Sequence, residues 1–83
     1  MNGFVYILLS LKDQRTYTGS TDDLNRRLNE HMNGLVYSTK NRLPFKLVLE
    51  LKFETLEEAR YMERYYKTAS GRKKLKGLLK DKI

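Results

Sequence analysis

With 83 residues, 40% of them apolar and 33% charged, the chain has the size and composition of one globular domain, expected to span residues 1–83. The absence of cysteine excludes disulfides, thiolate metal sites and a cysteine nucleophile, and it makes a cytoplasmic protein the default expectation. Seventeen basic against ten acidic residues leave a net charge of +7, which favours nucleic acid, before an anionic membrane surface, as the partner. No apolar run approaches the roughly 20 residues of a membrane span, so we expect no membrane insertion.

The chain begins with two expected strands joined by a polar turn. Residues 4–11, FVYILLSL, are almost continuously apolar, which predicts a central strand buried on both faces. The turn KDQR at 12–15 leads into TYTG at 16–19, a short strand rich in β-forming residues. Because the turn has an even number of residues, Tyr6 and Tyr17 should point to the same face of this hairpin.

A helix is expected next, capped by Ser20 or Thr21, with two aspartates in its first turn and an end at the Asn-Gly pair of residues 33–34. At 100° per residue, its leucines form one apolar side. Arg27 and His31, the single histidine of the chain, fall on that same side. A cation and an imidazole are thus expected to face the interior rather than the solvent.

The middle of the chain predicts a loop and a third strand. Residues 35–45 are rich in polar and basic groups, which is typical of a loop. Residues 46–53, KLVLELKF, alternate between apolar and charged side chains, which predicts a half-exposed strand at the edge of the sheet, with Val48 as an exception. The apolar face expected for this strand consists of Leu47, Leu49, Leu51 and Phe53.

A second helix opens with a capping box formed by Thr55 and Glu58. On its helical wheel Glu63 lies between Leu56 and Ala59, on the apolar side. A carboxylate is therefore expected on the buried face of this helix, as Arg27 and His31 are on the buried face of the first.

The last segment is strongly basic. Ser70 or Gly71 is expected to break the chain before a final helix over about 70–81, following a core over about 3–67. The apolar face of this helix would be Leu75, Leu78 and Leu79. The order β-β-α-β-α-α, with strands clustered, predicts an α+β fold with a small antiparallel sheet.

Arg27, His31 and Glu63 together leave two interpretations open. Burying an unpaired charge costs many kcal/mol, so such groups are paired, bind a metal or line a wet cleft. One interpretation is a structural Arg27–Glu63 ion pair with a satisfied core histidine, and tyrosines that belong to the core. The other is a site for hydrolysis at phosphorus, with a cation for the phosphoryl oxygens, a carboxylate for Mg²⁺, and a tyrosine or histidine as the base.

Five segments, in order and correctly spaced from about residue 4 to 67, resemble motifs of the GIY-YIG nuclease family. They are VYI at 5–7, YTG at 17–19, STDDLNRRLNEH at 20–31, LPFKLVLELKF at 43–53 and EEARYMERYYK at 57–67. The overall likeness is to small stand-alone bacterial proteins related to the N-terminal domain of excinuclease C, and the third-strand segment resembles Slx-type endonucleases.

This resemblance implies a three-stranded antiparallel sheet flanked by helices and an endonuclease with a single Mg²⁺ or Mn²⁺. By position, Tyr6 would be the general base and Tyr17 would orient the water or the scissile phosphate, and the two tyrosines can exchange these roles. Arg27 would contact the phosphate, His31 would assist proton transfer or positioning, and Glu63 would bind the metal ion.

The nucleic acid is expected to be DNA ahead of RNA. Gly19 would permit a tight turn and a close approach of the backbone. The candidates for phosphate contacts are Tyr37, Ser38, Thr39, Lys40 and Arg42 in the loop and Arg72, Lys73, Lys74 and Lys76 in the last helix.

Two functions therefore remain open at the level of sequence. The first is a metal-dependent hydrolase of phosphodiester bonds, structure-specific and acting in DNA repair or recombination. The alternative is a non-catalytic nucleic-acid-binding module on a nuclease scaffold, which would have no need of a carboxylate in its site. A protein-interaction adaptor that uses the leucines of the last helix has little support.

Overall fold

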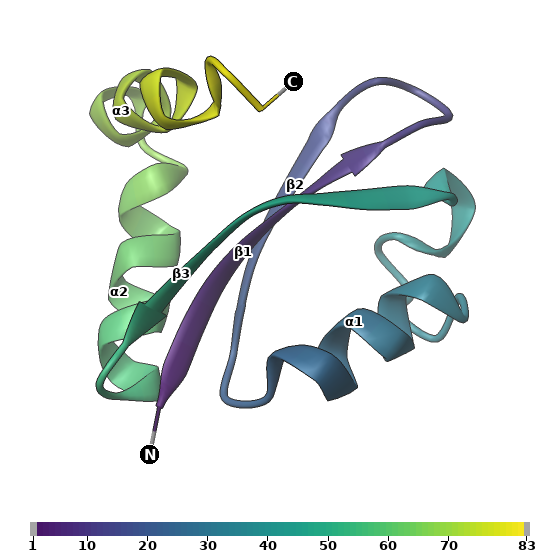
Figure 1. Ribbon diagram of the computed structural model, residues 1–83, viewed down its shortest axis with the longest axis horizontal. Helices are drawn as coiled ribbons and strands as arrows, with labels where there is room; N and C mark the ends of the chain where they lie inside the picture. The colour runs from purple at the N-terminus through teal and green to yellow at the C-terminus, as the bar shows by residue number, and fades with distance from the viewer. Residues whose placement is uncertain (1, 83) are drawn as a thin grey trace.

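The computed structural model describes residues 2–82, which form a three-stranded antiparallel sheet in the order β2-β1-β3 (Figure 1). The central strand β1 (Gly3–Ser10) pairs with β2 (Thr16–Thr21) on one side and with β3 (Phe45–Phe53) on the other. The central position of the first strand and the edge position of the third are as the sequence predicts.

Helices cover both faces of this sheet. Figure 1 shows α1 (Leu24–Met32) on one side and α2 (Leu56–Tyr66) with α3 (Ala69–Leu79) on the other. A short 3-10 turn, Lys40–Arg42, interrupts the loop before β3. The expected α+β fold is confirmed, and within residues 2–82 no helix is both long and apolar enough to cross a bilayer.

The alternation of β1 builds two cores, one on each face of the sheet. Val5, Ile7 and Leu9 pack with residues of α2 and α3. Tyr6 and Leu8 point the other way, toward the leucines of α1. Because both faces are covered by helices, β1 is apolar along nearly its whole length.

A β-bulge in β3 changes the expected faces of that strand. Ile7 pairs with Leu49 but Leu8 pairs with Leu47, so Val48 is an extra residue between two registered pairs. Leu47 therefore lies in the core beneath α1, whereas Leu49 lies against the core beneath α2 and α3. The prediction that Leu47 shares a face with the other alternate residues is wrong, because the bulge shifts the side-chain alternation by one position.

Two helix starts also differ from the predictions. The N-cap of α1 is Asp23, whose side chain accepts a hydrogen bond from the Arg26 amide, rather than Ser20 or Thr21. The N-cap of α3 is Thr68, which accepts from the Gly71 amide.

The chain is not broken at Ser70 or Gly71, contrary to the prediction, because both residues belong to α3. Gly71 lies within the helix, where the backbone of Tyr65 and Tyr66 leaves no space for a side chain. Leu75 is buried as expected, but Leu78 is 39% exposed and does not belong to the packed face. By contrast, the expected N-cap of α2 is confirmed, since the Thr55 side chain accepts from the Glu58 amide, and the Glu58 carboxylate accepts from the Thr55 hydroxyl.

Candidate active site

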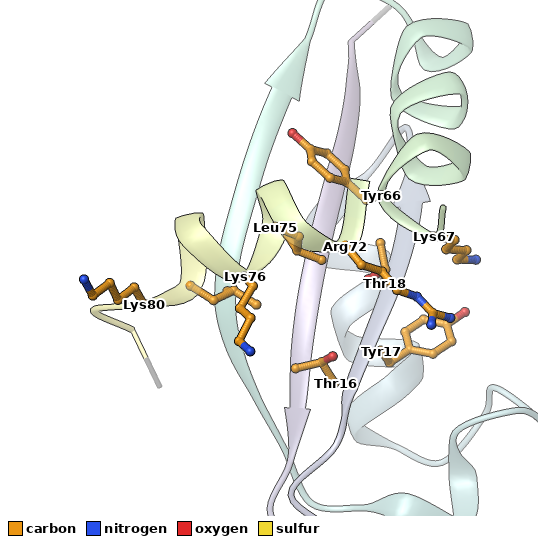
Figure 2. A pocket seen from close by; sticks show the side chains of 10 residues that line it. Thr16, Tyr17, Thr18, Tyr66, Lys67, Arg72, Leu75, Lys76 and Lys80 are labelled. Carbon is orange, nitrogen blue, oxygen red and sulfur yellow. The ribbon is translucent and has the colours of Figure 1, made fainter. Parts of the chain in front are cut away.

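The strand register brings the two tyrosines together. Tyr6 pairs with Gly19 across β1 and β2, and Leu8 pairs with Tyr17, so the tyrosines lie diagonally on one face, as predicted. Their ring centroids are 6.4 Å apart. Tyr6 is only 1% exposed, whereas Tyr17 is half-buried and reaches the rim of a groove (Figure 2).

His31 links the Tyr6 hydroxyl to the loop after α1. Its Nε2 lies 2.8 Å from Tyr6 Oη, and its Nδ1 lies 2.8 Å from Thr39 Oγ1. The Thr39 hydroxyl donates to the carbonyl of Val36, which can only accept, so Thr39 Oγ1 accepts from Nδ1–H. Nε2 then carries the lone pair and accepts the hydrogen bond that Tyr6 donates.

Burial controls the protonation of this pair. It lowers the pKa of His31 to about 4, and the nearby Arg27 charge acts in the same direction, so the imidazole is neutral at pH 7. Burial likewise raises the pKa of Tyr6 to about 12, although the Arg27 guanidinium opposes this shift. At neutral pH the pair is therefore a phenol that donates to a neutral imidazole.

Arg27 lies at the mouth of the site. Its guanidinium Nη1 is 3.0 Å from Glu30 Oε1, and its side chain is 34% exposed. The same guanidinium interacts with the Tyr6 hydroxyl, and both contacts raise the pKa of Arg27, with Glu30 the stronger of the two. Arg27 is thus a permanent positive charge that is positioned beside Tyr6 and still reachable from solvent.

Glu63 approaches the same hydroxyl from α2. Its Oε1 accepts a short hydrogen bond from Ser20 Oγ, and its Oε2 lies 2.6 Å from Lys67 Nζ. The carboxylate is close enough to Tyr6 to raise the pKa of that phenol as a minor cause, after burial and Tyr17 among the raising effects. The side chain remains 22% exposed.

The structural ion-pair interpretation is therefore wrong in its choice of partners. Arg27 pairs with Glu30, and Glu63 pairs with Lys67. His31, however, is fully buried with both ring nitrogens bonded, as expected of a satisfied core histidine. The structure thus combines a buried Tyr6–His31 pair with accessible charges on Arg27 and Glu63.

The Tyr6 hydroxyl lies so close to the backbone of Gly19 that no side chain fits at that position. A Cβ atom at Gly19 would lie 2.5 Å from Tyr6 Oη and 3.1 Å from Tyr17 Cε2. The missing side chain therefore leaves the space that the two phenols occupy.

The oxygen donors near Glu63 suit a hard cation. Within residues 2–82 no group of three or more His, Asp or Glu side chains could enclose a metal ion. One carboxylate with a neighbouring Ser20 hydroxyl instead matches Mg²⁺, which keeps most of its waters and is commonly bound through one or two carboxylates plus substrate phosphates. The residues present fit a single Mg²⁺ or Mn²⁺ that would be shared with the substrate.

The loop candidates for phosphate contacts divide into two groups. The prediction for Thr39 is wrong, because its side chain is fully buried against His31. The half-buried Arg42 guanidinium is occupied by Asp13, at 2.9 Å, and by the carbonyl of Arg15. Tyr37 is 85% exposed with the Lys40 ammonium over its ring, and Ser38 is also exposed.

The α3 candidates divide as well. Arg72 and Lys76 line the groove between α3 and β2, whereas Lys73 and Lys74 are exposed elsewhere on the helix.

Sequence reasoning missed two partners of Glu63. Lys67 follows Glu63 by four residues, which is the spacing at which helical side chains meet, so this pair is recognisable from the sequence. Ser20 is predicted only as a helix cap, although it pairs with Val5 on the sheet face that α2 covers. Its contact with Glu63 depends on how the helix lies against β2, which local sequence does not show.

Comparison with known proteins places these residues in a family. The profile of the family described as "GIY-YIG catalytic domain" matches residues 2–76. The chain is 44% identical over 75 residues to the UPF0213 protein BH0048 of Halalkalibacterium halodurans, covering 89% of this chain and 79% of that one. It is 36% identical over 74 residues to the UPF0213 protein YazA of Bacillus subtilis, covering 88% and 74%.

A solved structure agrees with this assignment. The solution NMR structure of the UPF0213 protein BH0048 from Bacillus halodurans matches with a TM-score of 0.57 and 38% identity. The match covers 94% of this chain and 85% of that one. The chain therefore shares its fold with this relative.

Proposed function

This chain belongs to the GIY-YIG family, and we propose that it is an endonuclease that hydrolyses phosphodiester bonds in DNA with the help of one Mg²⁺ or Mn²⁺. The observation that carries the proposal is the surroundings of the Tyr6 hydroxyl. An imidazole, a guanidinium, a second phenol and a carboxylate all act on it, from three different elements. A structure-specific role in DNA repair or recombination, in the cytoplasm, is part of the same proposal.

Glu63, with Ser20 beside it, is the group that would hold the metal ion. The ion would supply positive charge for the phosphoryl oxygens and for the attacking water when it is bound. Glu63 contributes the negative charge that attracts it, and Lys67 has to leave the carboxylate first.

Tyr6 and His31 provide a route for one proton. As a water molecule attacks phosphorus, Tyr6 Oη accepts the proton from that water and passes its own proton to His31 Nε2, which holds a lone pair. The two transfers leave Tyr6 neutral, so a phenolate with a pKa near 12 never has to accumulate. Because Tyr6 is 1% exposed, Arg27 has to turn outward before water reaches the hydroxyl.

Arg27 and Tyr17 would hold the phosphate. The guanidinium gives two parallel donors for phosphoryl oxygens and neutralises the charge that develops there. Tyr17, half-buried at the groove, is placed to orient the phosphate or the water. Substrate charge would draw Arg27 away from Glu30, which uncovers Tyr6 at the moment of binding.

One observation favours the non-catalytic alternative. The Lys67 ammonium satisfies the Glu63 carboxylate without any metal ion, as expected of a binding module that has kept a nuclease scaffold. Under this alternative, binding would depend strongly on salt and no strand would be cut.

A panel of end-labelled nicked, flapped, branched and single-stranded DNAs, each with Mg²⁺ or Mn²⁺, separates the two functions. The proposal predicts cleavage that leaves a 5′-phosphate, that EDTA stops and that Arg27→Ala greatly reduces. Binding of the whole panel by folded protein, without cleavage in either metal, would instead establish the alternative.

A further inference from the structure

A groove of about 750 Å³ lies between β2 and α3 and meets the site at two residues. Tyr17 forms part of its wall on the strand side, and Lys67, the partner of Glu63, forms part of the other. Since β2 is an edge strand, this side of the molecule is open to a long ligand. The groove therefore runs past Lys67, whose ammonium contacts the Glu63 carboxylate.

A row of cations follows the α3 side of the groove. Arg72, Lys76 and Lys80 are four residues apart, and Figure 2 shows their side chains one after another along α3, with Lys67 beyond Arg72. Four residues of helix correspond to a rise of about 6 Å, which is similar to the distance between neighbouring phosphates along one strand of DNA. Among the described residues that line the groove, four are basic and none is acidic.

The floor between these cations and β2 is apolar. Leu75, Leu79 and Tyr66 lie there, and the Tyr17 ring stands at the end near the site. A duplex hides its bases and presents phosphates on its outside, so it would leave such a floor unused. A single strand offers both a row of phosphates and exposed base faces, and proteins that bind single strands combine a basic groove with aromatic contacts.

We propose that this groove binds a single-stranded segment of DNA next to the phosphodiester that is cleaved beside Glu63 and Arg27. The inference rests on the proposed function for the cleavage itself. The backbone lies along Arg72, Lys76 and Lys80, and the bases lie against the apolar floor. This assigns a substrate class, DNA with an unpaired strand at the cleavage point.

The chain offers a charge-matched pair of variants to test this. Arg72→Ala with Lys76→Ala removes two charges inside the groove, and Lys73→Ala with Lys74→Ala removes two on the same helix outside it. Both double variants lower the net charge of +7 by the same amount. All four side chains are exposed, so circular dichroism and melting curves should match those of the unchanged protein.

The measurement is fluorescence anisotropy with a labelled oligothymidylate of about 12 nucleotides, in EDTA so that nothing is cut. The groove variant should bind about tenfold more weakly, and the slope of log affinity against log salt should fall by about 1.4, at 0.7 for each lost phosphate contact. The outer variant should lose less than about threefold. Equal losses for the two variants would overturn the proposal.

Two further ligands sharpen the result. A duplex of the same length should bind more weakly than the single strand and should distinguish the two variants less. Equal or tighter duplex binding with the same loss in the groove variant would overturn the assignment to single strands. Oligouridylate that binds the groove more tightly than oligothymidylate would overturn the assignment to DNA.

This test stands apart from the test of nuclease activity, because it needs neither metal nor cleavage. If the groove variant alone loses binding but no substrate is cut, the groove is correct and the proposed function fails. If DNA is cut but both double variants bind equally, the proposed function stands and the groove is wrong.

Discussion

The ammonium of Lys67 lies 2.6 Å from Glu63 Oε2 and so neutralises the carboxylate that would otherwise attract a divalent cation. Lys67 is the C-cap of α2, one turn after Glu63, and its side chain is 51% exposed against 22% for that of Glu63. The pair can therefore open without disturbing the core. When it opens, the Lys67 ammonium, which already lines the groove, becomes available to a phosphate there.

Lys67→Gln should bind metal more tightly than the unchanged protein. An exposed ion pair is worth about 0.2–1 kcal/mol, so we expect affinity for Mn²⁺, measured by titration calorimetry, to rise by up to about fivefold. Lys73→Gln removes the same charge away from the carboxylate and is the control. Unchanged or weaker Mn²⁺ binding by Lys67→Gln would show that this ammonium does not compete with the ion.

Gly19→Ala should destabilise the protein and abolish cleavage. The new methyl group would lie 2.5 Å from Tyr6 Oη, and the ring cannot move aside because Tyr6 is buried and bonded to His31. Overpacking of this kind costs about 1–3 kcal/mol in urea unfolding. Gly77→Ala, with open space around it in α3, should instead stabilise the helix slightly. Equal effects of the two changes would contradict the close contact at Gly19.

Stability should depend on His31 between pH 6.5 and pH 4. Because burial lowers the pKa of His31 to about 4, the unfolded chain takes up a proton in this range and the folded chain does not. The free energy of unfolding should therefore be highest above pH 6.5 and fall by up to about 3 kcal/mol as the pH drops to 4. Urea titrations of His31→Gln should show an unfolding free energy that depends less on pH over this range. An equally steep pH dependence in this variant would show that another group takes up the proton.

Tyr6→Phe should affect both stability and rate. It leaves the buried Nε2 of His31 without a donor, which costs about 1–3 kcal/mol of unfolding free energy. It also removes the proton acceptor, so the cleavage rate should fall about 10²- to 10⁴-fold. Tyr61→Phe, at an exposed position of α2, should change neither quantity. Full activity of Tyr6→Phe would show that Tyr6 is not the general base and would favour Tyr17 in that role.

The periodicity of the sequence predicts which side chains of the site face the sheet or share one of its faces, because the direction of a side chain follows from its position along a strand or helix. The even turn placed Tyr6 and Tyr17 on one side of the hairpin. The helical wheel placed His31 and Glu63 toward the sheet, where both make polar contacts. These placements need no knowledge of distant partners.

The details that local patterns missed depend on contacts between distant segments. The bulge at Val48 is defined by how β3 pairs with β1. The alternation of apolar and charged residues within β3 therefore does not show that Leu47 lies on the other face of the sheet. The burial of Thr39 follows from its hydrogen bond to His31, eight residues away. The strand β2 continues to Thr21, two residues beyond the predicted strand at 16–19. The helix α1 therefore begins later than predicted, and Asp23 is its N-cap.

The most direct test of the central claim is the rate at which Glu63→Gln cuts the best substrate of the DNA panel in Mg²⁺. The amide keeps an oxygen for the Ser20 hydroxyl but loses the charge that attracts the ion. Our account predicts loss of more than about 100-fold in cleavage, since a bound metal contributes several kcal/mol to the transition state. DNA binding in EDTA should be retained, and Glu57→Gln, on the exposed side of α2, should cut normally. Cleavage by Glu63→Gln at the rate of the unchanged protein would contradict the account.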